Sequence, residues 1–66
     1  AAVTVIARDA MLADAWATAL TVMGADEGLT FANDHDLAAR FITRSSKGLV
    51  ETMTPAFQRY LDASTQ

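Results

Sequence analysis

With 66 residues, the chain can form at most one small domain, and such a domain buries only about 60% of the surface that its unfolded form exposes. It has no cysteine and one histidine, which excludes disulfides and a cysteine–histidine metal cluster, whereas its 52% hydrophobic residues predict a folded core rather than a disordered tail. The formal net charge of −3, with five basic residues in no single run, argues against nucleic-acid binding.

The first two predicted elements are a strand and a helix. The stretch from Ala2 to Ala7 is short and rich in β-branched residues, which is typical of a strand with at least one buried face. The stretch from Asp9 to Gly24 predicts one amphipathic helix, because Asp9 is a good N-cap and Gly24 readily adopts the left-handed conformation just past a helix end. A strand end that leads directly into a helix start is a common place for ligands.

A second, shorter helix is predicted over residues 25–32. Its first turn carries two acidic residues, where the helix dipole favours negative charge, and Gly28 weakens it. The polar run over residues 33–36 ends the helix. His35 within that run is interpreted as a solvated loop residue rather than a metal ligand, because adjacent residues do not face one another. The residues spaced to face a core are Leu29 and Ala32.

The rest of the chain predicts a hairpin and a third helix. Two strand-like runs, Ala38 to Arg44 and Leu49 to Met53, are joined by a four-residue turn that closes on Gly48. Thr54 and Pro55 then begin the last helix as N-cap and first helical residue, and residues 62–66 are expected to fray. One buried stripe of that helix is predicted from Phe57, Tyr60 and Leu61. The predicted fold class is α/β of the α+β type, in the order strand-helix-helix-strand-strand-helix, with a mostly antiparallel sheet and the helices on one face.

Two oxygen-bearing side chains mark the first helix. Asp14 and Thr18 are four residues apart and therefore lie one turn apart on the same face, where a carboxylate and a hydroxyl can converge on a cation. Taken from these residues alone, a structural role is favoured, because an Asp can accept backbone hydrogen bonds and a helical Thr commonly bonds the carbonyl one turn back. Trp16 projects away from this face and is expected in the core or at an interface. The methionines, expected to fill the core, are Met11, Met23 and Met53.

Several segments, in order, match one known pattern. They are Val3-Thr4-Val5-Ile6-Ala7, Ala10-Met11, Ala13-Asp14-Ala15-Trp16-Ala17-Thr18-Ala19, Val22-Met23-Gly24, Gly28-Leu29, Thr54-Pro55-Ala56-Phe57 and Tyr60-Leu61. This order resembles the C-terminal part of the FAD:protein FMN transferase family, the flavin transferases once called thiamine-biosynthesis lipoproteins. The hexad from Asp14 to Ala19 resembles the family's D-(A/G)-x-x-T-(A/G) metal motif. Small departures, such as Arg8-Asp9 in place of Pro-Thr or Pro-Ser, do not touch that motif.

The resemblance implies an enzyme that moves the FMN half of FAD onto a Thr hydroxyl of a target flavoprotein, or that in some members hydrolyses FAD to FMN and AMP. It implies Mg²⁺ at Asp14 and Thr18, with a further backbone carbonyl from upstream, and FAD held mainly by an N-terminal region. That region and the expected His-x-x-Asp-Pro-x-Thr-Gly segment are missing from this sequence. We therefore expect residues 1–66 to be the C-terminal segment of a flavin transferase domain, with the rest of that chain as its partner, and we name no catalytic residue.

Alternatives from other classes remain open at this point. The chain could be a non-catalytic interaction module whose exposed first strand docks on a partner protein, and FAD and Mg²⁺ binding by the whole protein would separate this alternative from the enzyme. The segment alone is expected to be inactive and to self-associate through its strand edge. The resemblance also implies a periplasmic or cell-envelope location, with a lipid anchor as an option for the whole protein. No stretch approaches the roughly 18 apolar residues of a membrane span, so we expect a soluble segment.

Overall fold

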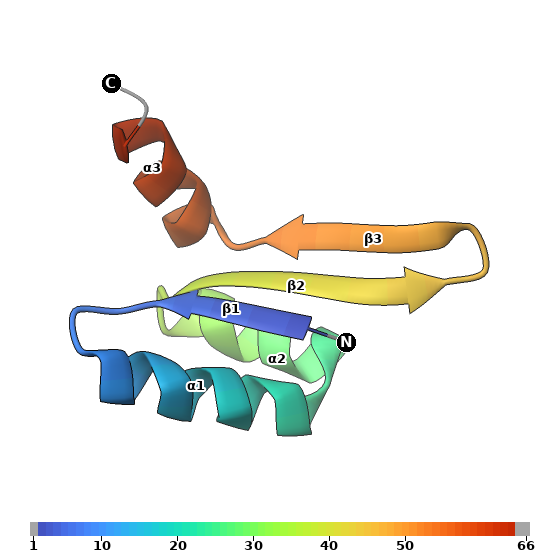
Figure 1. Cartoon of the computed structure of the whole chain (residues 1–66), viewed down its shortest axis with the longest axis horizontal. Helices are drawn as coiled ribbons and strands as arrows, with labels where there is room; N and C mark the ends of the chain where they lie inside the picture. Colours follow the sequence, from blue (N-terminus) through green and yellow to red (C-terminus); the bar gives the residue numbers. More distant parts are fainter. Residues whose placement is uncertain (1, 65–66) are drawn as a thin grey trace.

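A computed structural model describes residues 2–64 and contains six elements in the predicted order (Figure 1). They are β1 (Ala2–Ile6), α1 (Ala10–Met23), α2 (Ala25–Asp34), β2 (Ala38–Ser45), β3 (Gly48–Met53) and α3 (Pro55–Ser64). Both pairings of the three strands, β1 with β2 and β2 with β3, are antiparallel. The predicted fold class is therefore confirmed.

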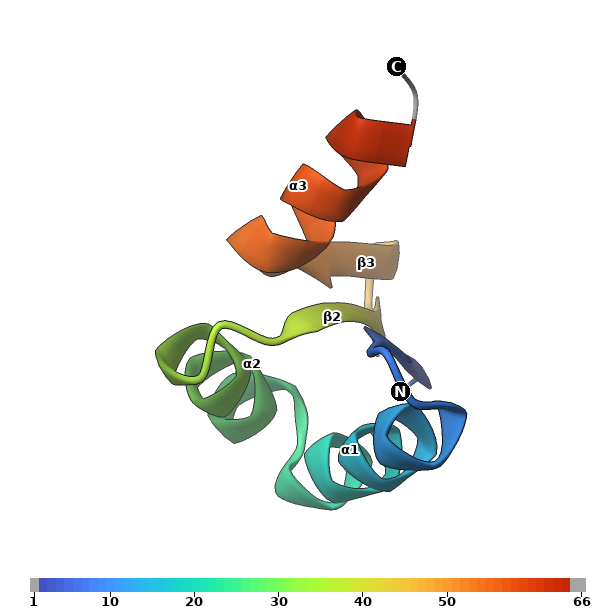
Figure 2. The same ribbon diagram turned by 90° about the vertical axis from the view of Figure 1, so that its left-hand side faces the viewer.

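The helices α1 and α2 lie on one face of the sheet. α1 packs against β1 and α2 against β2, while α3 follows the end of β3 and contacts the start of β2 (Figure 2). In the strand register Val3 faces Phe41 and Val5 faces Ala39, so the side chains of all four point to the same side. These four residues belong to the core between the sheet and the two helices.

The core has a fully buried centre. Leu20 of α1, Ala32 of α2 and Ala39 of β2 are 0% exposed, and Phe41 is 2% exposed. The predicted core positions on the second helix are confirmed, since Ala32 is part of this centre and Leu29 packs against it. The helices α1 and α2 and the strand β2 thus form the buried centre of one small core, and β1 packs against it.

Gly28 has a packing role that the sequence did not reveal. A Cβ atom placed on Gly28 would lie 2.9 Å from Cε2 of Phe41 and 3.1 Å from the backbone oxygen of Leu20. No real side chain can occupy that space unless the Phe41 ring moves. The glycine, expected only to weaken α2, therefore allows this helix to approach both the sheet and the end of α1.

Several element boundaries differ from prediction. α2 continues two residues further, to Asp34, because His35 caps its end: the backbone N–H of His35 donates to the carbonyl of Phe31 at 3.1 Å, and its ring stacks on the Phe31 ring at 4.0 Å. The hairpin loop has two residues rather than four, since Ser45 pairs with Gly48 and its hydroxyl donates to the Gly48 carbonyl at 3.0 Å. His35 is exposed, as expected, but it is held on an aromatic ring.

Some predictions about burial and about the C-terminal end were wrong. Tyr60 is 51% exposed, because α3 packs through Phe57 in its first turn and then leaves the sheet (Figure 1). The end expected to fray is helical through Ser64, whose hydroxyl donates to the carbonyl of Tyr60 at 3.0 Å; residues 65–66 lie outside the described part. Met11, expected in the core, is 82% exposed on the outer side of α1. The surface of α1 is thus less covered than its composition predicts.

Candidate functional site

The orientation of α1 follows from its cap and from one buried residue. The Asp9 carboxylate accepts hydrogen bonds from the backbone N–H groups of Met11 at 2.8 Å and Leu12 at 3.4 Å, as predicted for an N-cap. Leu20 points into the core and is fully buried. Asp14 and Thr18 lie on the other side of the helix, and both are exposed.

The Asp14–Thr18 pair shares one face and one hydrogen bond. The Thr18 hydroxyl donates to the backbone carbonyl of Asp14, with an oxygen–oxygen distance of 2.9 Å. A hydroxyl has one hydrogen and two acceptor lone pairs, so this bond directs the hydrogen toward the helix and leaves the lone pairs available to a cation. The local bond and a ligating role are therefore compatible, although they looked like alternatives from the sequence.

The Asp14 carboxylate accepts no hydrogen bond within residues 2–64. No backbone or side-chain group there donates a hydrogen bond to it, so the structural role favoured from the residues alone, acceptance of backbone hydrogen bonds, is absent from this part of the chain. The residues beside it include Ala13, Ala15 and Ala17, which are too small to shield it. An exposed carboxylate with an oriented hydroxyl one turn away is the result.

The pair fits Mg²⁺ as a partial set of ligands. Within the described residues there is no group of three or more His, Cys, Asp or Glu side chains that could hold a metal ion. Mg²⁺ is a hard cation that prefers oxygen, and it is often bound by one or two carboxylates together with water and substrate phosphates. The donor type of Asp14 and Thr18 agrees with that use, and a bound Mg²⁺ would take its remaining ligands from water, a substrate or another part of a protein.

A second Asp–Thr pair shows that the spacing alone is not specific. On α2, Thr30 donates to the backbone carbonyl of Asp26 at 3.1 Å, which is the same contact as on α1. This pair borders an open hollow of about 450 Å³ whose rim also includes two further carboxylates, those of Glu27 and Asp34. The α2 pair was not considered from the sequence, and it provides a matched control for experiments on the α1 pair.

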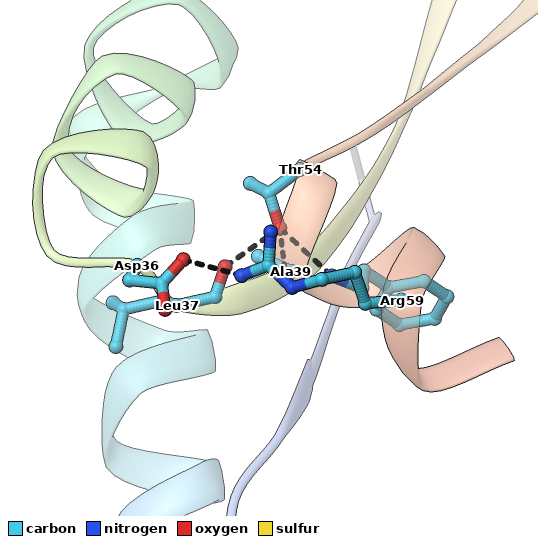
Figure 3. Close-up of polar contacts among 6 residues, drawn as sticks. Asp36, Leu37, Ala39, Thr54 and Arg59 are labelled. Atoms are coloured by element: carbon cyan, nitrogen blue, oxygen red, sulfur yellow. Dashed lines mark hydrogen bonds and ion pairs between the residues drawn. The ribbon is translucent and has the colours of Figure 1, made fainter. Parts of the chain in front are cut away.

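Thr54 has a larger structural role than predicted. It is 1% exposed, and its hydroxyl donates to the Leu37 carbonyl at 2.6 Å while it accepts from the N–H groups of Ala39 at 3.0 Å and Phe57 at 3.3 Å (Figure 3). The bond from Phe57 is the predicted N-cap. The other two connect the start of α3 to the start of β2, and no local pattern signals such long-range contacts.

An ion pair lies beside this junction. Nη2 of Arg59 on α3 lies 2.7 Å from Oδ1 of Asp36, which follows α2 (Figure 3). Both side chains are well exposed, at 63% and 77%, so water screens the attraction and the pair adds little to stability. The buried Thr54 hydroxyl and the buried Phe57 side chain therefore contribute more to the attachment of α3 than this ion pair does.

Comparison with solved structures shows the class of protein to which this fold corresponds. The chain is similar to the flavinyl transferase ApbE of Pseudomonas stutzeri in its apo form, with a TM-score of 0.84 and 42% identity over 86% of this chain and 18% of that one. It is also similar to the flavin transferase ApbE of Vibrio cholerae, with a TM-score of 0.83 and 32% identity over 86% of this chain and 18% of that one. The fold thus matches part of a flavin transferase.

Sequence comparisons agree and give the family. Over 59 residues the chain is 37% identical to the FAD:protein FMN transferase of Haemophilus influenzae and 36% identical to that of Klebsiella pneumoniae, matching 89% of this chain and 17% of each relative. The model of the ApbE family matches residues 1–41. The chain belongs to the ApbE family, and it spans less than a fifth of the length of these relatives.

Proposed function

We propose that this chain is the C-terminal, magnesium-ligating segment of an FAD:protein FMN transferase. The observation that carries the proposal is the exposed Asp14 carboxylate beside the oriented Thr18 hydroxyl, on a helix inside the residues that match the family. The relatives are FAD:protein FMN transferases, and their name states the reaction, transfer of FMN from FAD to a protein. The partners are the rest of a flavin transferase chain and a target flavoprotein that accepts FMN on a Thr.

Each residue of the pair has a distinct part in this proposal. Asp14 supplies the only formal charge of α1 and binds the cation directly. Thr18 presents a lone pair toward the same point, because its hydrogen is held by the backbone carbonyl one turn back. When bound, Mg²⁺ would offset the negative charge of the FAD pyrophosphate. The alanines around the pair have small side chains, so that a bulky dinucleotide can approach Asp14 and Thr18.

The location of the whole protein stays a prediction. Residues 2–64 contain no helix that is long and apolar enough to cross a membrane. The periplasmic or cell-envelope location, and a lipid anchor, rest on the family resemblance. In the same way, the assignment of residues 1–66 to the C-terminal end of a flavin transferase domain is part of the proposal.

Substitution of Thr18 separates ligation from helix structure. In a full-length flavin transferase that carries this segment, Thr18→Ser retains a hydroxyl and is expected to keep much of the FMN transfer. Thr18→Val keeps the shape but loses the oxygen, and is expected to lower transfer by about tenfold or more at limiting Mg²⁺. The measurement is FMN attached to the acceptor protein as a function of Mg²⁺ concentration, with thermal melting as the check on folding.

The matched control is Thr30→Val on α2, which removes the same hydroxyl-to-carbonyl bond outside the proposed site. It should cost at most about 1 kcal/mol of stability and leave transfer unchanged. An active, folded Thr18→Val enzyme would remove Thr18 from the metal site.

The 66-residue chain on its own is expected to be inactive and to bind Mg²⁺ weakly. One carboxylate and one hydroxyl leave most of an octahedral shell to water, so the dissociation constant should be about millimolar or higher. Calorimetry with Mg²⁺ and an assay for FMN, AMP and flavinylated acceptor measure both properties. Micromolar binding would show that the segment has further ligands.

The full-length enzyme can be tested for FAD hydrolysis in place of transfer. If labelled flavin accumulates in solution rather than on the acceptor protein, the enzyme hydrolyses FAD.

A further inference from the structure

The end of the β2–β3 hairpin projects beyond the rest of the molecule. Among the described residues, β1 pairs with β2 only as far as Ile42, whereas β2 and β3 continue to pair as far as Ser45 and Gly48. The residues of β2 beyond Ile42, at about 3.4 Å each, extend about 10 Å from the last pair with β1. Figure 1 shows the turn lying beyond β1, α1 and α2, at one end of the longest dimension of the molecule. We call residues 44–50 the hairpin tip.

The hairpin tip carries positive charge that no other described residue neutralises. Arg44 and Lys47 are exposed, and neither forms an ion pair within the described part of the chain. The sequence from residue 37 to residue 50 contains no acidic residue, and Glu51, the next one along the chain, pairs with Arg40. The formal net charge of the whole chain is −3. Positive charge is therefore concentrated at the projecting end of an acidic molecule.

Two exposed apolar side chains lie beside these cations. Leu49 is 69% exposed and Val50 is 46% exposed. Successive side chains of a strand point to opposite faces, so Leu49 and Val50 lie on different sides of the hairpin. Leu49 stands opposite Arg44 in the strand register, and Val50 stands opposite Thr43 on the side of the sheet where α2 lies. The hairpin tip thus offers apolar surface on both of its faces.

We propose that the hairpin tip is a contact for the surface of a membrane that contains anionic phospholipids. Arg44 and Lys47 would place their charges at the lipid phosphates, with the apolar parts of their side chains along the lipid boundary. The side chains of residues 49 and 50 would enter the region between headgroups and acyl chains. Two cations and two aliphatic side chains are a small set, so the contact is peripheral and reversible. This inference does not rest on the proposed function.

The shape of the hairpin tip favours a membrane over a folded protein as the partner. A protein that docks on one face of the hairpin leaves the apolar side chain of the other face in water. A fluid lipid surface can surround a projecting tip and cover Leu49 and Val50 together. The two cations, which lie with these residues at the same end of the molecule, match the negative charge of such a surface.

The projection also reduces repulsion between the acidic remainder of the chain and an anionic surface. At physiological ionic strength, exposed charges more than about 8 Å apart are largely screened. The projection of about 10 Å exceeds that distance, so an end-on approach brings Arg44 and Lys47 to the surface first. Asp26 of α2 borders the same hollow as Val50, and it is the acidic residue expected to oppose the contact.

Binding of the 66-residue chain to vesicles tests the proposal. Flotation with phosphatidylcholine vesicles that contain phosphatidylglycerol is compared with flotation with phosphatidylcholine alone. Each Lys or Arg near an anionic surface strengthens binding about fivefold, so the anionic vesicles should bind the chain about tenfold more strongly or better. Arg44→Gln should lower this binding about fivefold, and Leu49→Ser should lower it about threefold. Circular dichroism checks that each variant is folded.

Arg8→Gln is the matched control, because it removes the same charge from an exposed position outside the hairpin tip. It should change binding less than about twofold, since the charge at residue 8 does not reach the surface in the end-on approach. Equal binding to the two kinds of vesicle, or equal losses for Arg8→Gln and Arg44→Gln, would overturn the proposal.

A fluorescent label gives an independent measurement of the orientation. The chain has no cysteine, so Leu49→Cys provides a single thiol for a nitrobenzoxadiazole label. With anionic vesicles, the emission of this label should shift to the blue and should be quenched by nitroxide-labelled lipid. The same label on Thr30→Cys, at an exposed position of α2, should show neither effect. A label at residue 49 that stays in water while the chain floats with the vesicles would contradict the proposed contact.

Two further results would assign the hairpin tip to another partner and overturn the membrane proposal. In a full-length flavin transferase that carries this segment, a thiol of Leu49→Cys that does not react with a soluble maleimide would show that other residues of that chain cover the tip. A 66-residue chain that ignores both kinds of vesicle but binds soluble polyglutamate, with a loss in Arg44→Gln, would identify an acidic protein as the partner.

Discussion

Replacing Asp14 by Ala in a full-length flavin transferase that carries this segment should lower FMN transfer by about 100-fold or more while the protein stays folded. The substitution removes the only formal negative charge that α1 offers to the cation. Alanine is a better helix former than aspartate, and the carboxylate accepts no hydrogen bond within residues 2–64, so stability should not fall. Transfer is measured as protein-bound flavin fluorescence after denaturing electrophoresis, together with a thermal melt.

Asp26→Ala on α2 is the matched control, because Asp26 also stands four residues before a threonine that bonds its carbonyl. This variant should transfer FMN at the parental rate. A large loss for Asp26→Ala with full activity for Asp14→Ala would move the proposed site from α1 to the hollow beside α2.

Among the substitutions proposed here, Thr54→Val should cause the largest loss of stability. Valine has the shape of threonine but neither donates to the Leu37 carbonyl nor accepts from the Ala39 N–H group, and both of those groups lie at a junction where Thr54 is 1% exposed. An unsatisfied buried group costs about 1–3 kcal/mol, so the sum is comparable with the whole stability of a small domain. Chemical denaturation of the 66-residue chain should show a mostly unfolded variant.

The two comparisons for Thr54 are Thr54→Ser, which keeps the hydroxyl, and Thr30→Val, which removes an exposed one. Both should remain folded, with losses of at most about 1 kcal/mol for the Thr30 variant. If Thr54→Val unfolds at the same denaturant concentration as Thr30→Val, the buried hydroxyl does not hold α3 to β2.

Local signals in the sequence were sufficient for the order of elements. Asp9, Gly24 and Thr54 are residues whose chemistry ends or begins a helix within a few positions, and each one does so in the structure. The features that escaped prediction depend on residues far apart in the chain. The space at Gly28 is defined by the ring of Phe41, and the contacts of Thr54 cross from β3 to the start of β2. Contacts between residues far apart in the chain do not follow from hydrophobic periodicity or from secondary-structure propensity.

The candidate site was predicted in part. The shared face of Asp14 and Thr18 follows from helical geometry, and the structure confirms it, because the Thr18 hydroxyl bonds the Asp14 carbonyl. The assignment to Mg²⁺ came from the family resemblance. The spacing alone could not supply it, because a pair with the same spacing and the same bond is present on α2. The exposure of Met11 could not be foreseen, because the apolar character of a residue does not determine whether it lies on the side of a helix that packs against the core.

A change of metal preference tests the central claim most directly. The segment contains no cysteine, so Asp14→Cys in the full-length enzyme introduces a single thiolate at the proposed ligand position of this segment. A thiolate binds soft cations such as Cd²⁺ better than Mg²⁺, whereas a carboxylate prefers Mg²⁺. FMN transfer by Asp14→Cys should be nearly absent with Mg²⁺ and should rise on addition of Cd²⁺, while Asp14→Ala should respond to neither. Full Mg²⁺-dependent activity of Asp14→Cys, with no response to Cd²⁺, would contradict the assignment of Asp14 as a magnesium ligand.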